Sequence, residues 1–530
     1  MRRSPSEPTA AAVEPSAVQH TVVRCGLGAS GWARCALAPV VALWPVAAAW
    51  AQTDTLPRAL SIQPTASISQ SFSDNVLLTP TNPQGGSMTR LSAGVALRAR
   101  SGLVRGFLDY SLSQVLYSAG QQNSLQNALN ANVDTELVDG RAKLGVTAAI
   151  SQSAVSAFGA QPSLGGGSQA NTTEVRNLRV TPSFQGPIGS ALRYTSQVSY
   201  ALTDARDTQV GDGSTASATV HIQPTLLTRL SWGLDGSHQR TAYKLGRTTT
   251  NDRLSGTATT QLHDLDLQLQ AGAGVELTDL STVQRTSYHT WGLGATWTPS
   301  TRTRVVAQYD HRFYGASHSL TLEHRTALTT WRLTDSRSLS TAGDQPAAAG
   351  RGTAYDLFYS QFASLIPDPV KRQDFTNDFL SKQGIIPGQQ IGFLRSSASV
   401  LEAQEASVAW RNVRSTAVIA FTRTATRRLD TSAGMVGDLA NSATVRQHGL
   451  SVNLTHRLTP QSTLNLLATE QRGQGDQANQ RSRQRQFSLQ ATTTPTVGST
   501  LTGGIRRAVY DTFPTAYGES AIFATYGIRF

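Results

Sequence analysis

Cysteine is almost absent from this 530-residue chain, and neither of the two present lies beyond residue 35. Cys25 and Cys35 both fall within an N-terminal segment whose pattern, described below, indicates an export signal. Once that segment is removed, the remaining chain has no thiol at all. The sequence therefore predicts neither disulfides nor thiolate metal sites in the exported protein.

Long apolar runs are missing as well. After residue 51 the chain has no run of about 20 apolar residues, the length that a membrane-spanning helix needs. Charged residues make up only 15% of the chain, against about 25% in a typical soluble domain. Serine, threonine, glutamine, glycine and alanine take their place. This composition favours neutral polar strands over charged surface helices.

Sequence motifs of common enzymes are also missing beyond residue 51, including the nucleophile elbow, the H-E-x-x-H zinc motif and the phosphate-binding loop. His318 and His324 have no helical spacing and no further ligands nearby. We therefore expect no catalytic residue, cofactor or metal site, although a hydrolase site assembled from distant residues stays open as an alternative. The net charge is +12, but the basic residues are scattered and the chain is exported, so nucleic acid is not an expected partner.

The first 51 residues have the features of a signal peptide. Basic residues precede an apolar core, "CALAPVVALWPVAAAW", at 35–50, and Ala49–Ala51 provides a small-x-small cleavage site. The two prolines in this core argue against the alternative, a buried hydrophobic helix. We expect residues 1–51 to be removed and residues 52–530 to form the mature domain.

The rest of the chain alternates apolar and polar residues with a period of two. One example runs from Leu91 to Ala99, and another from Leu267 to Leu277. Such alternation predicts strands with one apolar face. Short turns, such as Asp139-Gly140, alternate along the chain with longer polar loops, such as residues 152–174. Short turns on one side and long loops on the other are typical of outer-membrane barrels.

The strand count must be even if the chain begins and ends on the same side of the membrane. A first assignment gives 21 strands, and splitting residues 319–340 at Thr326–Leu328 gives 22. The sequence therefore predicts an all-β protein, a closed antiparallel transmembrane barrel of about 22 strands, with an even number in the range 18–24. The expected location is the bacterial outer membrane.

The C-terminus alternates to its last residue. Its outward positions are predicted to face lipid and to act as the membrane-insertion signal; they are Ile522, Ala524, Tyr526, Ile528 and Phe530. This pattern resembles the C-terminal signal that the barrel-assembly machinery of bacteria reads. The machinery is thus an expected partner, together with outer-membrane lipid and lipopolysaccharide.

Charged residues on the opposite face of the strands are candidates to line the lumen. They are Arg98, Arg100, Arg105, Asp109, Arg304, Asp310, Arg312, Arg506 and Arg529. Two interpretations stay open. These residues neutralise and solvate one another in a water-filled interior, or they form a cationic path for anionic solutes.

One segment, about residues 341–395, breaks the strand rhythm. Its apolar residues are spaced as on a helix, and Asp368-Pro369 suits the start of a second helix. The candidates for insertion into the lumen are Phe358, Phe362, Leu365, Phe375 and Phe379. The segment is either a surface loop with local helix or a constriction folded into the lumen.

Three stretches carry a resemblance to a known family: "SQSFSDNVLL" at 69–78, "HRTALTTWRL" at 324–333 and "LFYSQFASLIPDPVKRQDFTNDFLSKQGI" at 357–385. With them, the chain resembles the outer-membrane β-barrel proteins associated with the PEP-CTERM/exosortase system. The resemblance implies a non-enzymatic role in exopolysaccharide export or surface assembly, with export components as partners. The alternatives are a general porin or uptake channel, and a structural or docking barrel with an occluded lumen.

Overall fold

The computed structural model describes residues 60–118, 123–159, 171–226, 229–341, 393–429, 436–512 and 516–530, and eight single positions between 359 and 379. The predicted signal segment, residues 1–51, lies outside the described residues. The described part of the chain forms 22 strands, the 3-10 turn η3 and the one-turn helix α4. In order, these elements are β1 Leu60–Ser73, β2 Gly86–Arg100, β3 Val104–Tyr117, β4 Ser124–Val138, β5 Ala142–Ala154, β6 Thr172–Ile188, β7 Leu192–Ala205, β8 Gly213–Pro224, β9 Leu230–Tyr243, β10 Thr249–Leu262, η3 His263–Leu265, β11 Leu267–Thr278, β12 Thr286–Ser300, β13 Thr303–Arg312, β14 Gly315–Arg325, β15 Thr329–Ser340, β16 Ser399–Arg411, β17 Ser415–Arg428, α4 Asp438–Asn441, β18 Thr444–Arg457, β19 Ser462–Gln474, β20 Arg481–Thr493, β21 Ser499–Asp511 and β22 Tyr517–Arg529.

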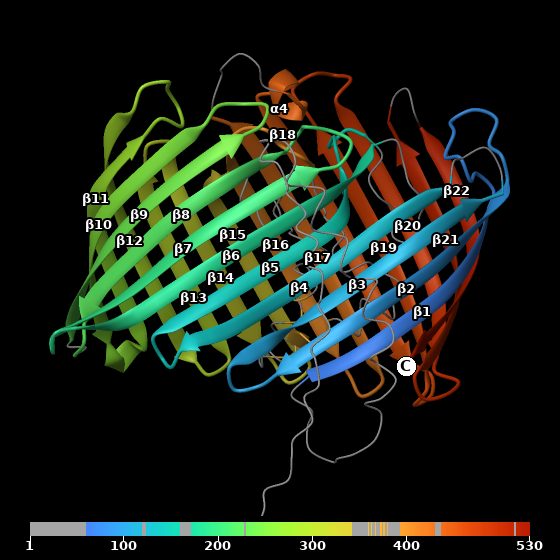
Figure 1. Cartoon of the computed structure of the whole chain (residues 1–530), viewed down its shortest axis with the longest axis horizontal. Coiled ribbons are helices and arrows are strands. Elements are labelled where there is room, and N and C mark those ends of the chain that lie inside the picture. Colours follow the sequence, from blue (N-terminus) through green and yellow to red (C-terminus); the bar gives the residue numbers. More distant parts are fainter. Residues whose placement is uncertain are drawn as a thin grey trace, which may run out of the picture. The chain divides into compact units, whose positions relative to one another are not determined.

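Each strand pairs antiparallel with the next, and the last strand pairs with the first. The closing pair runs from Thr65 opposite Arg529 to Ser73 opposite Ala521. Figure 1 shows the resulting wall of tilted strands. Closure leaves no strand edge without backbone hydrogen-bond partners, which a barrel within a membrane requires. The predicted closed antiparallel barrel is confirmed, with 22 strands.

The connections follow the predicted alternation. The strand ends that long connections join, such as those of β5 and β6 and of β15 and β16, lie at the end of the barrel opposite the C-terminus (Figure 1). Short turns lie at the other end. Gly140, with a φ of +62°, occupies the β4–β5 turn in a conformation that side chains disfavour. The predicted split at Thr326–Leu328 is confirmed as the β14–β15 turn. One exception is residues 313–314, which join β13 to β14 tightly on the long-loop side.

The outer face of the wall is apolar. Large side chains at every second position are exposed there, among them Trp232, Trp291, Trp297, Phe421, Phe487 and Leu454. A closed wall with such a face is suited to lipid, and the short-turn end then lies in the periplasm. The chain is an integral barrel of the bacterial outer membrane. None of the helices in the described residues is long and apolar enough to cross a membrane.

The inner face is mostly polar. Along β20, for example, Gln484, Gln486 and Gln490 are buried, whereas Phe487 between them is exposed on the outside. Period-two alternation thus sorts side chains between lipid and lumen, as strand geometry requires. The lumen is therefore the place where polar groups from distant parts of the chain meet.

Candidate functional site

The outer end of the lumen is crossed by the connection that follows β5. The carbonyl oxygen of Ala157 accepts a hydrogen bond from Ser482 Oγ of β20, at 3.0 Å. The carbonyl oxygen of Phe158 accepts one from Tyr510 Oη of β21, at 2.7 Å. Ser482 and Tyr510 are both buried. The start of this loop therefore lies against the inner wall formed by β20 and β21.

The end of the 341–398 connection, just before β16, contacts β5 and the β7–β8 loop. The backbone N–H of Leu394 donates to the carbonyl oxygen of Ala154 in β5, at 3.2 Å. Two residues later, Ser396 Oγ accepts a hydrogen bond from the N–H of Gly211, at 3.0 Å. Arg395, between them, is buried and donates to Ser340 and Ser399. This segment thus ties β15 and β16 to β5 and to the β7–β8 loop.

Apolar contacts reinforce these crossings. Phe393 packs with Ala157, Leu439 and Val445, and Leu394 packs with Val175 and Ala205. All seven residues are less than a tenth exposed. We call the two crossing segments, residues 155–159 and 393–398, the outer closure.

Aromatic residues of the predicted insert lie inside the barrel. Phe362 is 2% exposed and packs against Ala409 of β16 and Val418 of β17. Both partners are buried, while their strand neighbour Ile419 is exposed on the lipid side, so the contact is on the lumen face. The ring centroids of Phe375 and Phe379 lie 4.9 and 5.1 Å from that of Phe362. The backbone is helical at all three phenylalanines.

The other two insert candidates, Phe358 and Leu365, lie outside the described residues. The described contacts nevertheless attach the insert to the inner wall near the short-turn end of β16 and β17. These contacts place Phe362 inside the barrel, and a constriction of the pore by the insert stays a prediction.

Two cavities open from the lumen, on different arcs of the wall. The first, about 860 Å³, is lined by β1–β3 and β19–β22 and by the turns at their short-turn end. The second, about 460 Å³, is lined by β7–β13. The lumen therefore offers two separate environments.

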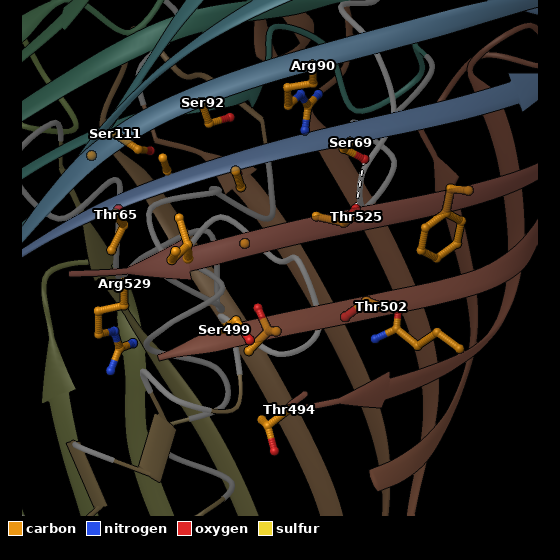
Figure 2. A pocket seen from close by; sticks show the side chains of 18 of the residues that line it. Thr65, Ser69, Arg90, Ser92, Ser111, Thr494, Ser499, Thr502, Thr525 and Arg529 are labelled. Carbon is orange, nitrogen blue, oxygen red and sulfur yellow. Dashed lines mark hydrogen bonds between the residues drawn. The ribbon is translucent and has the colours of Figure 1, made fainter. Parts of the chain in front are cut away.

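The first cavity is cationic and rich in neutral polar groups. Its charged lining residues are Arg90, Arg506 and Arg529, and no carboxylate lines it in the described residues. Figure 2 shows Arg90 and Arg529 on its wall among serine and threonine side chains. Thr525 Oγ1 donates to Ser69 Oγ within this lining, at 2.8 Å.

Polar atoms in the same wall lack partners. Ser71 Oγ, Asn465 Oδ1 and Gln486 Nε2 are buried and have no hydrogen-bond partner within the described residues. Each belongs to a residue less than a tenth exposed that lines the first cavity. Buried polar atoms without partners carry a free-energy cost, so a polar solute in the cavity would be stabilised by them.

The second cavity has charges of both signs in its lining. His221 Nδ1 lies 2.7 Å from Asp235 Oδ1, and an amino group of Arg253 lies 3.4 Å from Asp310 Oδ1. In the first cavity, by contrast, the charged lining residues are all arginines, and the carboxylate that pairs with Arg506, Glu519, lies outside the lining.

The nine charged candidates do not form one group. Arg98 forms a two-bond pair with Asp109, Arg312 pairs with the fully buried Glu276, and Arg506 lies 2.8 Å from Glu519. Only Arg506 and Arg529 line the first cavity, and only Asp310 lines the second. The remaining three, Arg100, Arg105 and Arg304, lie in β2, β3 and β13, near their short-turn ends.

Several lining residues were not among the sequence candidates: Arg90, Ser71, Asn465 and Gln486. Alternation alone could have found Arg90, which shares the inner face of β2 with Arg98. The three uncharged residues also occupy inward positions of their strands. No sequence feature distinguishes them from the other inward polar residues.

The C-terminal candidates lie on the outer wall. Ile522, Tyr526 and Phe530 are exposed, and Ala524 and Ile528 share their face of β22. Opposite them, β1 contributes Ile68 and Phe72, which are also exposed. The seam of the barrel is therefore apolar on its lipid side, while a role as insertion signal stays a prediction.

No metal site is indicated in the part of the chain that the structure describes, since no three His, Cys, Asp or Glu side chains gather there. No protein-family model matches the sequence, and no curated protein matches it either.

Solved outer-membrane structures are distantly similar. The FrpB iron transporter of Neisseria meningitidis (F3-3 variant) is 10% identical with a TM-score of 0.48, over 90% of this chain and 82% of that one. BauA, the ferric preacinetobactin receptor of Acinetobacter baumannii, is 10% identical with a TM-score of 0.46, over 88% and 80%. OccK5 of Pseudomonas aeruginosa is 10% identical with a TM-score of 0.32, over 89% and 98%. These likenesses are too distant to bear on what this barrel binds or moves.

Proposed function

We propose that this protein is a non-enzymatic outer-membrane conduit for an acidic exopolysaccharide, serving its export or surface assembly in a PEP-CTERM/exosortase-type system. The observation that carries the proposal is the first cavity, where arginines occur with hydroxyl and amide groups and without a lining carboxylate. Hydroxyl and amide side chains exchange hydrogen bonds with sugar hydroxyls. Guanidinium groups pair with carboxylates of acidic sugars. The sequence resemblance supports the same process.

Access to the cavity also suits export. Its lining includes residues 494–500 and Arg529, at the short-turn end, which faces the periplasm. The outer closure lies at the opposite end. In this proposal a chain enters from the periplasm and leaves only when the outer closure and the insert move aside.

A strain lacking the gene tests the proposal. Acidic polysaccharide is expected to accumulate in the periplasm and to decrease at the cell surface. Complementation with Arg529→Gln is expected to restore less surface polysaccharide than complementation with Arg304→Gln, a lumen-side arginine outside both cavities. Unchanged surface polysaccharide in the deletion strain would refute the export role.

A general uptake channel fits the same cavity about as well, because the lining does not fix a direction of transport. Growth of the deletion strain on small organic anions separates the two. Impaired growth with normal surface polysaccharide would favour uptake.

A structural or docking barrel with an occluded lumen is the third possibility. The packing of Phe362 on the inner wall and the outer closure favour it. Reconstituted barrels that show no ion conductance under any condition, even without the insert, would support this role over a conduit.

A further inference from the structure

A row of basic side chains, three arginines and one histidine, crosses the outer wall of β17–β20. Arg423, His448, Arg472 and Arg483 are successive cross-strand partners, one from each strand. They lie on the lipid-facing side of the wall, because exposed Phe421, Leu450 and Phe487 occupy the same faces of their strands. We call these four residues the basic row.

The row marks the edge of the apolar surface. Phe421 and Leu450, paired across β17 and β18, are the next outward residues toward the periplasm. On the long-loop side of the row, Arg446 and Arg481 continue the basic surface on β18 and β20. The row therefore lies where the outer leaflet changes from acyl chains to headgroups, and the outer leaflet of this membrane consists of lipopolysaccharide.

The charge of the row is only partly balanced by the protein. Glu470 Oε1 accepts hydrogen bonds from Nε of Arg472, at 2.6 Å, and from Nε of Arg483, at 3.0 Å. Asp511, opposite Arg483 in register, accepts instead from Arg485, at 3.0 Å. Arg423 has no carboxylate partner in the described residues. Like charges directly opposite each other destabilise a strand pair, so an external anion at the row would stabilise it.

At two other places, outward charges beyond the apolar band are matched. Asp252 of β10 contacts both His238 of β9 and Arg285, which precedes β12. On β15 and β16, Arg337 Nε lies 3.0 Å from Glu402. Arg240 of β9 is a single outward arginine, so the run of basic cross-strand partners on four neighbouring strands distinguishes the β17–β20 row from these places.

We propose that the basic row, chiefly through its three arginines, binds the phosphate groups of lipopolysaccharide in the outer leaflet. Guanidinium groups form paired, charge-assisted hydrogen bonds with phosphate. Phe421, Leu450 and Phe487 directly below would contact the acyl chains of the same molecule. The row lies on the outer wall and the cavities lie inside, so this proposal does not depend on the proposed function.

The test compares lipid binding by the purified full-length barrel in detergent. Bound lipopolysaccharide is measured by native mass spectrometry during titration, with phosphatidylglycerol and dephosphorylated lipopolysaccharide as matched probes. The triple variant Arg423→Gln/His448→Gln/Arg472→Gln removes three of the four row residues. We expect it to bind lipopolysaccharide at least about tenfold more weakly, because charge-assisted hydrogen bonds are lost.

Controls separate a specific site from general attraction. Arg240→Gln removes an exposed arginine from the long-loop side of β9 and is expected to change binding less than about twofold, since such lone surface charges contribute little. Arg423→Gln alone removes an arginine that has no ion pair within the described residues. Its lipopolysaccharide binding is the measurement used if the triple variant does not fold. Equal binding of the single or triple variant and the parent would overturn the proposal. Equal binding of phosphatidylglycerol and lipopolysaccharide would overturn the assignment to lipopolysaccharide.

Discussion

Asp438, in α4 before β18, accepts a hydrogen bond from the backbone N–H of Ala157 at 2.6 Å, across 281 residues of sequence. The same carboxylate accepts a second bond from Ser156 Oγ, at 2.8 Å. Through these bonds the β17–β18 loop holds the segment that crosses to β20 and β21. Protonation of the Asp438 carboxylate is therefore expected to change the stability of the outer closure.

The closure is expected to be more stable at acidic than at neutral pH. Burial raises the pKa of Asp438 above its usual value, although the bonds from Ala157 and Ser156 partly offset this. The closed form therefore binds a proton more tightly than the open form. Its stability falls as the pH rises from the usual aspartate pKa to the raised one, and is constant above that. Single-channel recordings should show longer closed times as the pH is lowered through this window.

Two substitutions at Asp438 serve as controls. Asp438→Asn keeps an acceptor for Ala157 and cannot ionise, so its closed times should not change with pH in this window. Asp438→Ala leaves the Ala157 N–H without its acceptor, at a cost of about 1–3 kcal/mol, and should shorten closed times at every pH. A pH response in Asp438→Asn equal to that of the parent would contradict the assignment.

The pair of Arg506 and Glu519 is expected to be strongly coupled. Their side chains are 5% and 8% exposed and lie 2.8 Å apart. Arg506→Met would leave Glu519 buried without its charge partner, which typically costs about 3–5 kcal/mol. The double variant Arg506→Met/Glu519→Leu should recover most of this loss. Urea unfolding of the refolded barrel measures the parent and both variants, and a double variant no more stable than Arg506→Met would contradict the prediction.

Much of the fold could be predicted from the sequence because it rests on local patterns. Alternation defines each strand and its two faces, and glycine at Gly140 marks a turn by its backbone conformation. The tight β13–β14 turn at residues 313–314 lies on the long-loop side, where the alternation of short turns and long loops predicts a longer connection. The even strand count makes β22 antiparallel to β1, which closure of the barrel by this pair requires.

The interior could not be predicted in the same way. Parity places Arg98, Arg312 and Arg506 on the inner face, but pairing with Asp109, Glu276 and Glu519 depends on register between strands. The outer closure depends on contacts between residues far apart in sequence, such as the hydrogen bond from Ser482 to Ala157. Contacts of this kind have no local signal.

The seam between β1 and β22 provides a test of membrane assembly. Ile522 is exposed on the lipid side and lies opposite Phe72. Ile522→Arg places a charge in lipid, at a cost of up to about 2–4 kcal/mol near the midplane. We expect a reduced yield of folded barrel, measured by heat-modifiable migration on gels. Thr525→Asn, on the lumen face of the same strand, should fold with normal yield. Equal yields for the two variants would contradict the face assignment.

Deleting the insert is expected to open the pore without unfolding the barrel. Residues 345–392 lie between strands, so their removal leaves the ladder of 22 strands and its lipid face intact. Phe362 and its aromatic neighbours would no longer cover Ala409 and Val418 on the inner wall. Single-channel conductance of the reconstituted variant should rise several-fold.

A point substitution refines the same test. Phe362→Ala should loosen the insert, because emptying a buried phenylalanine site typically costs about 3–5 kcal/mol. Conductance should then fluctuate between parent-like and deletion-like levels, since the insert is still attached at both ends. Phe375, which is 37% exposed, offers the control: Phe375→Ala should disturb conductance less. Parent-like conductance in both the deletion and Phe362→Ala would mean that the insert does not obstruct the pore.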